Sequence, residues 1–311
     1  MTKKKKPSFD ISERMVPEFH KGHSIYGEHF IRYEATQEIV SGKIVLDIAS
    51  GSGYGTKMIA RSAKKVFGVD VSAESIEYAK QHFGSKNIEY ICGDGESIPL
   101  ADASVDVVVS FETIEHIKDY KTFMKEVSRV LKKDGLLLLS TPNDLEFAEG
   151  NHYHLHEFEE AELTDLIKQH FKNVKMYFQG DWVYSALLPA KRMSVESETT
   201  FPLPTLQLAP KDPKNYLYFY ALCSNRTITE TVPEIGAFSE HWSARQIQEK
   251  DQETIAYNTE VNEALKQARA HIAYLEESVR LKDNHIQNLE AENRRTVTNK
   301  VRRVVKKIRR S

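Results

Sequence analysis

Short apolar runs alternate with segments of helical periodicity over the first half of the chain. Five runs rich in Val, Ile, Leu and Phe are predicted as buried strands, at residues 43–49, 64–70, 88–94, 105–111 and 135–141. Between them, apolar residues recur at helical spacing in 55–64, 72–83 and 120–133. Near-continuous apolar strands that alternate with helices are typical of a parallel sheet covered on both faces, so the sequence predicts an α/β fold.

Two further strand candidates follow, at 171–188 and 215–225, with no long helical pattern between them. They are predicted to pair antiparallel at one edge of the sheet. Residues 156–163 are predicted to begin the helix that precedes them. The segment 190–214 is rich in Pro, Ser and Thr and is expected to be a long loop, which in a compact domain is usually functional or disordered.

The last 75 residues contain neither Gly nor Pro and are predicted to be largely helical. Apolar residues alternate there at spacings of four and three, and eight of ten positions in the stripe are apolar: Val261, Leu265, Ala268, Ile272, Leu275, Val279, Lys282, Ile286, Leu289 and Asn293. Such a narrow stripe is typical of a coiled-coil seam, here a rod of roughly 50 Å. The alternative is a single helix that lies on the preceding domain. The β-branched residues favour a parallel dimer, whereas Ala268 and Lys282 leave a trimer open.

The charge of the chain is unevenly distributed. The net charge is −2, yet residues 294–311 contain nine basic and no acidic residues, so the rest of the chain carries −11. The apolar residues of this tail share one helical face but fall out of phase with the seam: Val297, Val301, Val304, Val305 and Ile308. A basic amphipathic helix on an anionic membrane surface explains both features. The alternatives are continuation of the coil and binding to an acidic protein or nucleic acid.

Composition excludes several classes of protein. No run of 18 apolar residues is present, so no transmembrane helix is expected. The basic start "MTKKKKPSFD" is followed by no apolar segment, and two isolated cysteines fit a reducing compartment, so the chain is predicted to be cytoplasmic. The predicted organisation is a basic flexible N-terminus (1–19), a catalytic domain (20–226), a linker (227–245), a coiled coil (246–295) and the basic tail (296–311).

Candidate binding residues follow the predicted strands. The first strand runs into "LDIASGSGYGT", which contains Asp47, Gly51, Gly53 and Gly55. Closely spaced glycines between a strand and a helix let the backbone approach a ligand, although a purely structural turn is the alternative. The spacing G-x-G-x-G differs from the dinucleotide pattern and argues against NAD. Asp70 ends the second strand, where a carboxylate can accept hydrogen bonds from ribose hydroxyls. Asp94 follows the third strand beside the expected adenine, with a turn residue as the alternative.

These segments together resemble the class I S-adenosylmethionine-dependent methyltransferases. The resemblance covers roughly residues 20–226 and rests on "VLDIASGSGYGT", "VFGVDVS", "IEYICGDGESIPLADASVDVVVSFETIEHI" and "LLLLSTPN" in that order. It implies a Rossmann-like doubly wound seven-stranded sheet whose last strand is antiparallel, with S-adenosyl-L-methionine as cofactor. It further implies roles for residues at four places. Asp47, Gly51, Gly53 and Gly55 would face the methionine portion, Asp70 and Val71 the ribose, Asp94 and Gly95 the adenine, and Ser110, Phe111 and Glu112 the methyl group.

Four histidines are candidate general bases for a hydroxyl acceptor: His116 in "ETIEHI", and His152, His154 and His156 in "NHYHLHEF". We expect His154 to act as the base and His116 to pack beneath the site. Histidine clusters also bind metals. The sequence offers no nearby set that completes a ligand shell, so no metal is predicted. The alternative role of this segment is a lid or the entry to the next helix.

The segments next to these motifs indicate which class of molecule accepts the methyl group. The position after the fourth strand reads "SFET" rather than the Asp/Asn-Pro-Pro-aromatic motif of enzymes that methylate nucleic-acid amino groups, so no nucleic acid is expected. The lead-in "ERMVPEFHKGHSIYGEHFIRYEAT" and "STPN" followed by "YHLHEF" are similar to methyltransferases of cell-surface polysaccharides and of quinones. The whole layout resembles O-antigen chain-terminating methyltransferases with a C-terminal coiled coil.

This resemblance implies a specific function and setting. The protein would methylate a sugar hydroxyl at the non-reducing end of a lipid-linked O-antigen on the inner face of the inner membrane. Residues 261–293 would form a homo-oligomer, and 297–311 would bind the membrane or the glycan polymerase. The alternatives are a small-molecule, quinone-type O-methyltransferase and a coiled-coil scaffold of glycan assembly with a vestigial donor site.

Overall fold

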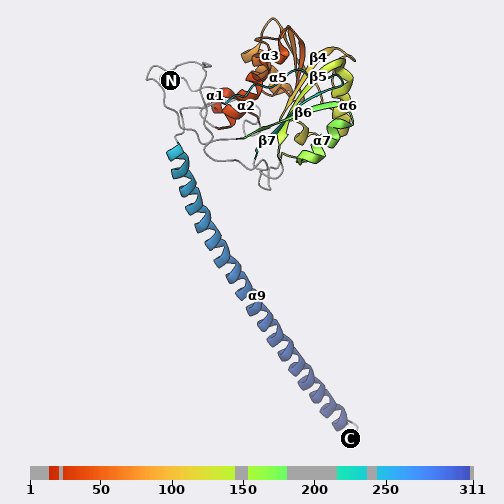
Figure 1. Ribbon diagram of the computed structural model, residues 1–311. Helices are drawn as coiled ribbons and strands as arrows, with labels where there is room; N and C mark the ends of the chain where they lie inside the picture. Colours follow the sequence, from red (N-terminus) through yellow and green to blue (C-terminus); the bar gives the residue numbers. More distant parts are fainter. Residues whose placement is uncertain (1–13, 21–23, 144–152, 181–215, 237–243, 309–311) are drawn as a thin grey trace. The chain divides into compact units, whose positions relative to one another are not determined.

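The computed structural model of the 311-residue chain describes residues 14–20, 24–143, 153–180, 216–236 and 244–308. The chain divides into two compact units, Met1–Trp242 and Ser243–Ser311, and each unit is described by itself. The first unit contains a sheet with helices on both faces, and the second contains one long helix (Figure 1).

The sheet of the first unit has seven strands in the order β3-β2-β1-β4-β5-β7-β6. The strands are β1 (Ile44–Ile48), β2 (Lys65–Asp70), β3 (Ile88–Cys92), β4 (Val105–Phe111), β5 (Leu131–Pro142), β6 (Asn173–Gln179) and β7 (Tyr218–Ser224). The first five are parallel, and β7 pairs antiparallel with both β5 and β6. The predicted doubly wound sheet, with its last strand antiparallel, is confirmed.

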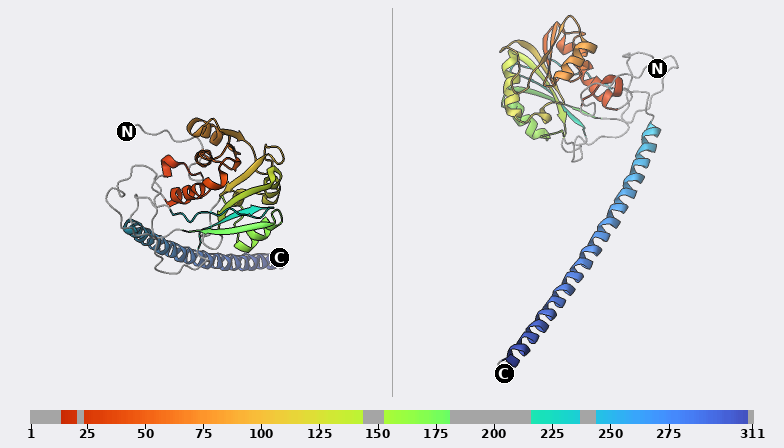
Figure 2. Two further views of the ribbon diagram at one scale, coloured as in Figure 1. Left: turned by 45° about the horizontal axis from the view of Figure 1, so that its top comes forward. Right: turned by 180° about the vertical axis from the view of Figure 1, so that it is seen from behind.

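Helices cover both faces of this sheet (Figure 2). One face carries α6 (Tyr120–Val130) and α7 (Glu160–Lys168), and the other carries α2 (Ser24–Glu34), α3 (Gln37–Val40), α4 (Tyr54–Ile59) and α5 (Ala73–Phe83). The short helices α1 (Pro17–His20) and η1 (Ile114–His116), a 3₁₀ turn, complete the unit. Ser72 caps α5 by accepting a hydrogen bond from the Ser75 N–H, and Asp119 caps α6 in the same way through Thr122.

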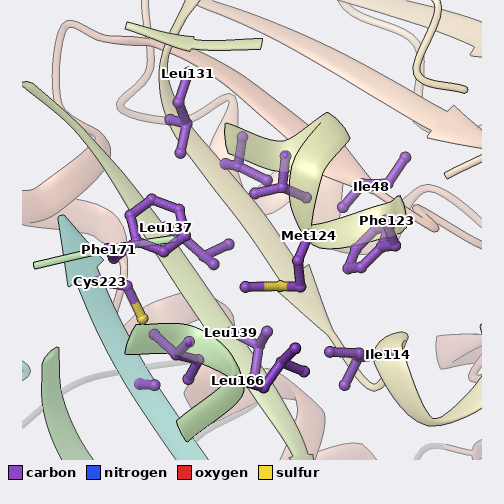
Figure 3. Packing of buried hydrophobic residues seen from close by; sticks show 14 of the residues in the cluster. Ile48, Ile114, Phe123, Met124, Leu131, Leu137, Leu139, Leu166, Phe171 and Cys223 are labelled. Atoms are coloured by element: carbon purple, nitrogen blue, oxygen red, sulfur yellow. The ribbon is translucent and has the colours of Figure 1, made fainter. Parts of the chain in front are cut away.

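Two apolar cores lie on opposite faces of the sheet because successive strand residues point to opposite sides. Leu137 and Leu139 of β5 pack with α6 and α7, whereas Leu136 and Leu138 pack with the α3 and α4 side. Figure 3 shows part of the first core, in which Met124 and Leu166 from two helices meet Leu139. These alternating runs explain why near-continuous apolar strands were correctly predicted to be covered on both faces.

Some element boundaries differ from the sequence prediction, most clearly at the junction of α6 and β5. The helix predicted for 120–133 ends at Val130, and β5 begins directly at Leu131, earlier than the predicted 135. Leu131 has an extended backbone and pairs with Val105, and a register shift follows in the β4–β5 ladder. The predicted strand over 171–188 is observed as β6 up to Gln179. The predicted loop at 190–214 lies outside the described residues.

The second unit consists of α9 (Ala244–Ile308), a helix of 65 residues. The predicted long helix is therefore present, whereas its association into a coiled coil stays a prediction. The predicted seam residues whose side chains are described are exposed on this single chain, among them Val261, Leu265, Ile272, Leu275, Val279 and Leu289. Within the described part of the chain, the length and apolarity needed to cross a bilayer occur together in no helix.

Candidate active site

The candidate site lies where the carboxyl ends of β1 and β4 adjoin. In the sheet, β2 lies next to β1 on one side and β4 lies next to it on the other. The order of the strands therefore reverses between β1 and β4. Crevices outside the carboxyl ends of strands bind ligands at such switch points. Ala49 (φ 59°) and Glu112 (φ 50°) follow the two strands with positive φ, a costly backbone for a residue with a side chain. This local strain marks the same place as the Gly-rich turn.

The three glycines of the turn have different structural reasons. A Cβ on Gly51 would meet no atom within 4 Å, so its backbone (φ +53°) is open to a ligand. A Cβ on Gly53 would lie 2.5 Å from Cβ of Ala79, and one on Gly55 would lie 2.1 Å from Cζ of Tyr33. Close approach to a ligand therefore explains Gly51, whereas the expectation for Gly53 and Gly55 was incomplete because internal packing already requires them to be glycine.

Asp70 connects the second strand to this turn. Its Oδ2 accepts a hydrogen bond from the Gly51 N–H (2.8 Å), and Oδ1 accepts one from the Ser72 N–H (2.9 Å). A carboxylate has about four lone-pair positions, so two remain for a ligand's hydroxyls. Val71, which follows, is 68% exposed. The structure thus places Asp70 beside Gly51, and the predicted ribose contacts of Asp70 and Val71 stay predictions.

Asp47 has a different environment from the one predicted. It is 1% exposed, and its Oδ2 accepts a hydrogen bond of 2.5 Å from the Thr56 hydroxyl in α4. Burial raises the pKa of Asp47 to about 7, with a smaller contribution from the Asp70 charge, while hydrogen bonds from Thr56 and Tyr33 oppose the rise. The Asp47 side chain thus holds the first turn of α4 in place through Thr56. Because it is buried, its effect on a ligand is indirect, through the position of that turn.

The third strand ends in a turn at the same edge. Asp94 is exposed, and its Oδ1 accepts a hydrogen bond from the Glu96 N–H, so the turn role and an adenine contact are compatible. A Cβ on Gly95 would lie 3.1 Å from the Phe123 ring, which makes this glycine a packing position as well.

Ser110 and Phe111 at the end of β4 and Glu112 directly after it differ in where their side chains lie. Ser110 is fully buried, and Phe111 packs edge-on against Tyr33 and tilted against Tyr220, so both belong to the interior of the sheet. Strand alternation turns both side chains into the interior, and the expectation that these two residues border the methyl group stays a prediction. Glu112 alone of the three reaches the edge: its Oε1 accepts a hydrogen bond from the Ser140 hydroxyl (2.7 Å).

Arg32 of α2 faces this carboxylate and was missed by the sequence analysis. Its Nη1 lies 3.9 Å from Glu112 Oε1 and donates to the Gln179 side chain, and its guanidinium carbon lies 4.6 Å from the Tyr218 ring centre. Burial works to lower the pKa of Arg32, but Glu112 and further acidic groups raise it overall. No hydrogen-bond partner for Nε and Nη2 exists among the described residues. A buried cation thus lies next to the end of β4.

Two histidines that follow Glu112 in the sequence, His116 and His154, lie close together in the structure. The rings of His116 and His154 have centres 5.0 Å apart. The side chain of His116 is 31% exposed and that of His154 only 9%, so His116 is the more accessible of the two, and the predicted roles of both stay predictions. His156 instead contacts Glu162 (2.8 Å) and stacks on Tyr120, and His152 lies outside the described residues.

Glu115 joins these two histidines and was also missed. It is fully buried, and burial raises the pKa of its carboxyl well above the ordinary value, with the Glu112 charge adding to the rise. One ligand atom each from Glu115, His116 and His154 lies within 4.8 Å of the others. The sequence argument against a metal, that no nearby residues complete a ligand set, therefore fails. The spacing Glu112-x-x-Glu115-His116 after a strand at the switch point was the signal that could have indicated this cluster.

Comparison with known proteins agrees with this geometry. Residues 46–139 match the family described as "Methyltransferase domain". A probable S-adenosylmethionine-dependent methyltransferase of Mycolicibacterium smegmatis is 35% identical over 161 residues, which cover 50% of this chain and 62% of that protein. One of Mycobacterium tuberculosis is 34% identical over 160 residues, covering 50% and 58%. A ubiquinone biosynthesis O-methyltransferase of Coxiella burnetii is 32% identical over 115 residues, covering 36% and 49%.

These matches concern part of each protein. The chain spans about three-fifths of the length of its mycobacterial relatives. Within that part, residues 46–139 are similar to methyltransferase domains, and the mycobacterial relatives are named as S-adenosylmethionine-dependent, so the donor that this similarity implies is S-adenosyl-L-methionine. The open backbone at Gly51, the carboxylate of Asp70 and the exposed Asp94 are the residues that fit this donor.

Proposed function

We propose that this protein is an S-adenosylmethionine-dependent O-methyltransferase that methylates a sugar hydroxyl at the non-reducing end of a lipid-linked O-antigen polysaccharide and so ends its elongation. The observation that carries the methyltransferase activity is the hydrogen bond between Gly51 and Asp70 at the switch point, inside the stretch that matches methyltransferase domains.

The main contribution of the protein to this reaction is to align the acceptor oxygen with the methyl group of the donor. When bound, the donor supplies a methyl group already activated by a positively charged sulfur. Gly51 and Asp70 hold the donor, and the residues after β4 hold the acceptor, so that orientation lowers much of the barrier. A hydroxyl acceptor must also lose its proton as the new bond forms. The described groups near the end of β4 that can help are Glu112, His116 and His154.

An oxygen acceptor is supported by two observations. The Coxiella relative is named an O-methyltransferase. The residues at the end of β4 and directly after it read Ser110-Phe111-Glu112-Thr113, which lacks the motif of enzymes that methylate base amino groups. Both favour a hydroxyl over a nitrogen.

A lipid-linked glycan is supported by the second unit. α9 is a 65-residue helix with an exposed apolar stripe over 261–293 and nine basic residues after 293. A second copy of this chain is the proposed occupant of the stripe, in a dimer or trimer, because the apolar seam repeats at heptad spacing. The basic end is proposed to bind the anionic inner face of the cytoplasmic membrane, or the polymerase there. A small-molecule acceptor gives no reason for either feature.

The second candidate is a quinone-type O-methyltransferase, which the Coxiella relative favours. Incubating the full-length protein with methyl-labelled donor and either purified lipid-linked glycan or a hydroxylated quinone separates the two. We expect label at the glycan terminus. Label on the quinone alone would contradict the glycan proposal and leave the methyltransferase activity standing.

The scaffold alternative is tested by calorimetry with S-adenosylhomocysteine. We expect saturable binding at micromolar concentration. Absence of binding at high micromolar concentration, together with no label on either acceptor, would favour a protein that organises glycan assembly without catalysis.

A further inference from the structure

Three potential metal-binding side chains converge from two distant parts of the sequence. Glu115 and His116 end the 3₁₀ turn η1 after β4, and His154 lies in the segment before α7. One ligand atom from each lies within 4.8 Å of the others. Nitrogen atoms of two imidazoles and a carboxylate oxygen at this separation can bind one ion between them.

The backbone holds the two segments together. The N–H groups of Leu155 and His156 both donate to the carbonyl oxygen of Glu115, at 2.7 and 3.2 Å. This holds the histidine segment against η1 directly after His154. The convergence of the side chains is therefore fixed by main-chain hydrogen bonds rather than by side-chain contacts alone.

Both rings are oriented by a hydrogen bond at Nδ1. His116 Nδ1 lies 2.8 Å from the carbonyl oxygen of Tyr153, which can only accept, so Nδ1 carries the proton. His154 Nδ1 lies 2.7 Å from the Glu157 carboxylate, which places a proton there as well. In the neutral rings the lone pair is then on Nε2. A backbone carbonyl or a carboxylate that fixes Nδ1–H is the arrangement found behind metal-binding histidines.

Glu115 adds a buried carboxylate with one unused oxygen. The side chain is fully buried, its Oε2 accepts a hydrogen bond from the Thr141 hydroxyl (2.9 Å), and its Oε1 has no hydrogen-bond partner among the described residues. Oε1 lies 3.9 Å from Nε2 of His116, toward the cluster. Leaving a buried carboxylate oxygen unpaired is costly, and a cation at this point would compensate for it.

We propose that Glu115 Oε1, His116 Nε2 and His154 Nε2 bind a divalent first-row transition-metal ion. Two imidazole ligands favour Zn²⁺, Fe²⁺, Co²⁺ or Ni²⁺ over Mg²⁺ and Ca²⁺, which prefer oxygen. Three protein ligands leave at least one position open to water or to an acceptor oxygen. Glu112 is not counted as a ligand, since its Oε1 is used by Ser140 and lies beside Arg32.

The functional meaning of this ion rests on the proposed O-methyltransferase activity. An acceptor hydroxyl on the open position would lose its proton more readily, since a bound metal ion strongly acidifies its oxygen ligands. A histidine whose Nε2 binds the ion cannot accept a proton at that atom. The ion would therefore take over the part that His154 was predicted to play as a general base.

The test uses Co²⁺ alone as the probe, with full-length protein and no donor present. Co²⁺ bound through imidazole nitrogen and carboxylate oxygen absorbs in the visible, so titration reports binding without any activity measurement. We expect one Co²⁺ per chain, displaced by Zn²⁺ and not by Mg²⁺. Glu115→Gln, His116→Ala and His154→Ala are each expected to weaken binding at least about tenfold, and Glu157→Gln, behind His154, by about 10- to 100-fold.

The matched control is His156→Ala, which removes the next histidine of the same segment but not a proposed ligand. It is expected to bind Co²⁺ as the wild type does. Circular dichroism and thermal unfolding establish that each variant is folded, and Glu157→Gln keeps the test open if a buried substitution unfolds the domain. No saturable Co²⁺ binding by the wild type, unchanged binding in folded His154→Ala, or an equal loss in His156→Ala would each overturn the proposal.

Failure of the metal site and failure of the proposed function give different results. Calorimetry with S-adenosylhomocysteine on the same sample reads the donor site. Co²⁺ binding without donor binding leaves the metal site and removes the methyltransferase function, whereas donor binding without Co²⁺ binding removes only the metal site.

Discussion

The backbone N–H of Gly51 donates a 2.8 Å hydrogen bond to Oδ2 of Asp70, which joins the turn after β1 to the end of β2. In Asp70→Asn the ribose hydroxyls lose a charged acceptor, a hydrogen bond of about 1.5–3 kcal/mol. We expect affinity for S-adenosylhomocysteine to fall about 10- to 100-fold by calorimetry. Asp165→Asn, on the exposed side of α7, is the matched control and should bind normally. Unchanged affinity in Asp70→Asn would remove Asp70 from the donor site.

The glycines of the turn are expected to separate binding from folding. Gly51→Ala adds a methyl group into open space at a cost of about 1–2 kcal/mol for its positive φ, and it blocks the approach of the donor. Gly53→Ala places a Cβ 2.5 Å from Ala79, and such overpacking costs about 1–3 kcal/mol or more in addition to the positive φ. Urea unfolding should therefore show a larger loss in the free energy of unfolding for Gly53→Ala than for Gly51→Ala. Folded Gly51→Ala should bind the donor more weakly than the wild type. Equal losses of unfolding free energy in the two variants would contradict the conclusion that packing requires Gly53 and ligand approach requires Gly51.

Asp47 predicts a specific dependence of stability on pH. Its pKa rises from 3.8 to about 7 on folding, so the folded state binds the proton more tightly than the unfolded chain. The stability from the protonated carboxyl is fully present below about pH 4 and is lost as pH rises to 7 and above. The free energy of unfolding of wild type minus that of Asp47→Asn should thus fall by up to about 4 kcal/mol between pH 4 and 8. A difference that stays constant or rises over this window would contradict the burial argument.

The exposed stripe of α9 predicts self-association. Replacing Ile272 and Val279 with Ser removes two β-branched residues that are 55% and 58% exposed on the single chain. We expect sedimentation equilibrium to show an oligomer for the wild type and a monomer for this variant at the same concentration. Glu263→Ser with Glu277→Ser, on the other side of the helix, should leave the oligomer intact. A monomeric wild type would leave the stripe to a different partner.

The basic tail predicts membrane binding that does not depend on the catalytic domain. Replacing Val301, Val304, Val305 and Ile308 with Ser keeps all nine basic residues but removes the apolar face. We expect co-sedimentation with vesicles of anionic lipid to be lost, as in a protein that ends at Asn293, while donor binding is retained. If vesicle binding survives, charge alone attaches the tail. If only RNA is retained, in a salt-dependent way, the tail serves nucleic acid instead.

The sequence by itself determined the fold because its signals are local. A strand such as 105–111 is apolar at 105, 107, 109 and 111 on one face and at Val108 in the middle of the other, and a sheet covered on both sides buries both faces. The turn 49–55 and the aspartate at 70 likewise follow strands, and parallel strands end at one edge of a sheet. The place of the predicted donor site could therefore be inferred from the local sequence, whereas the roles of its residues came from the family resemblance and stay predictions.

Only the tertiary structure decided which side chains reach that edge. Phe111 and Ser110 lie next to Glu112 in the sequence but turn into the cores, and two of three glycines in the turn are required by Tyr33 and Ala79. The meeting of Glu115 with His154, across 39 positions of sequence, depends on hydrogen bonds from Leu155 and His156 to one carbonyl oxygen. Contacts between distant segments carry no periodic signal along the chain, so the acceptor side of the site emerged only when the sheet and its loops were in place.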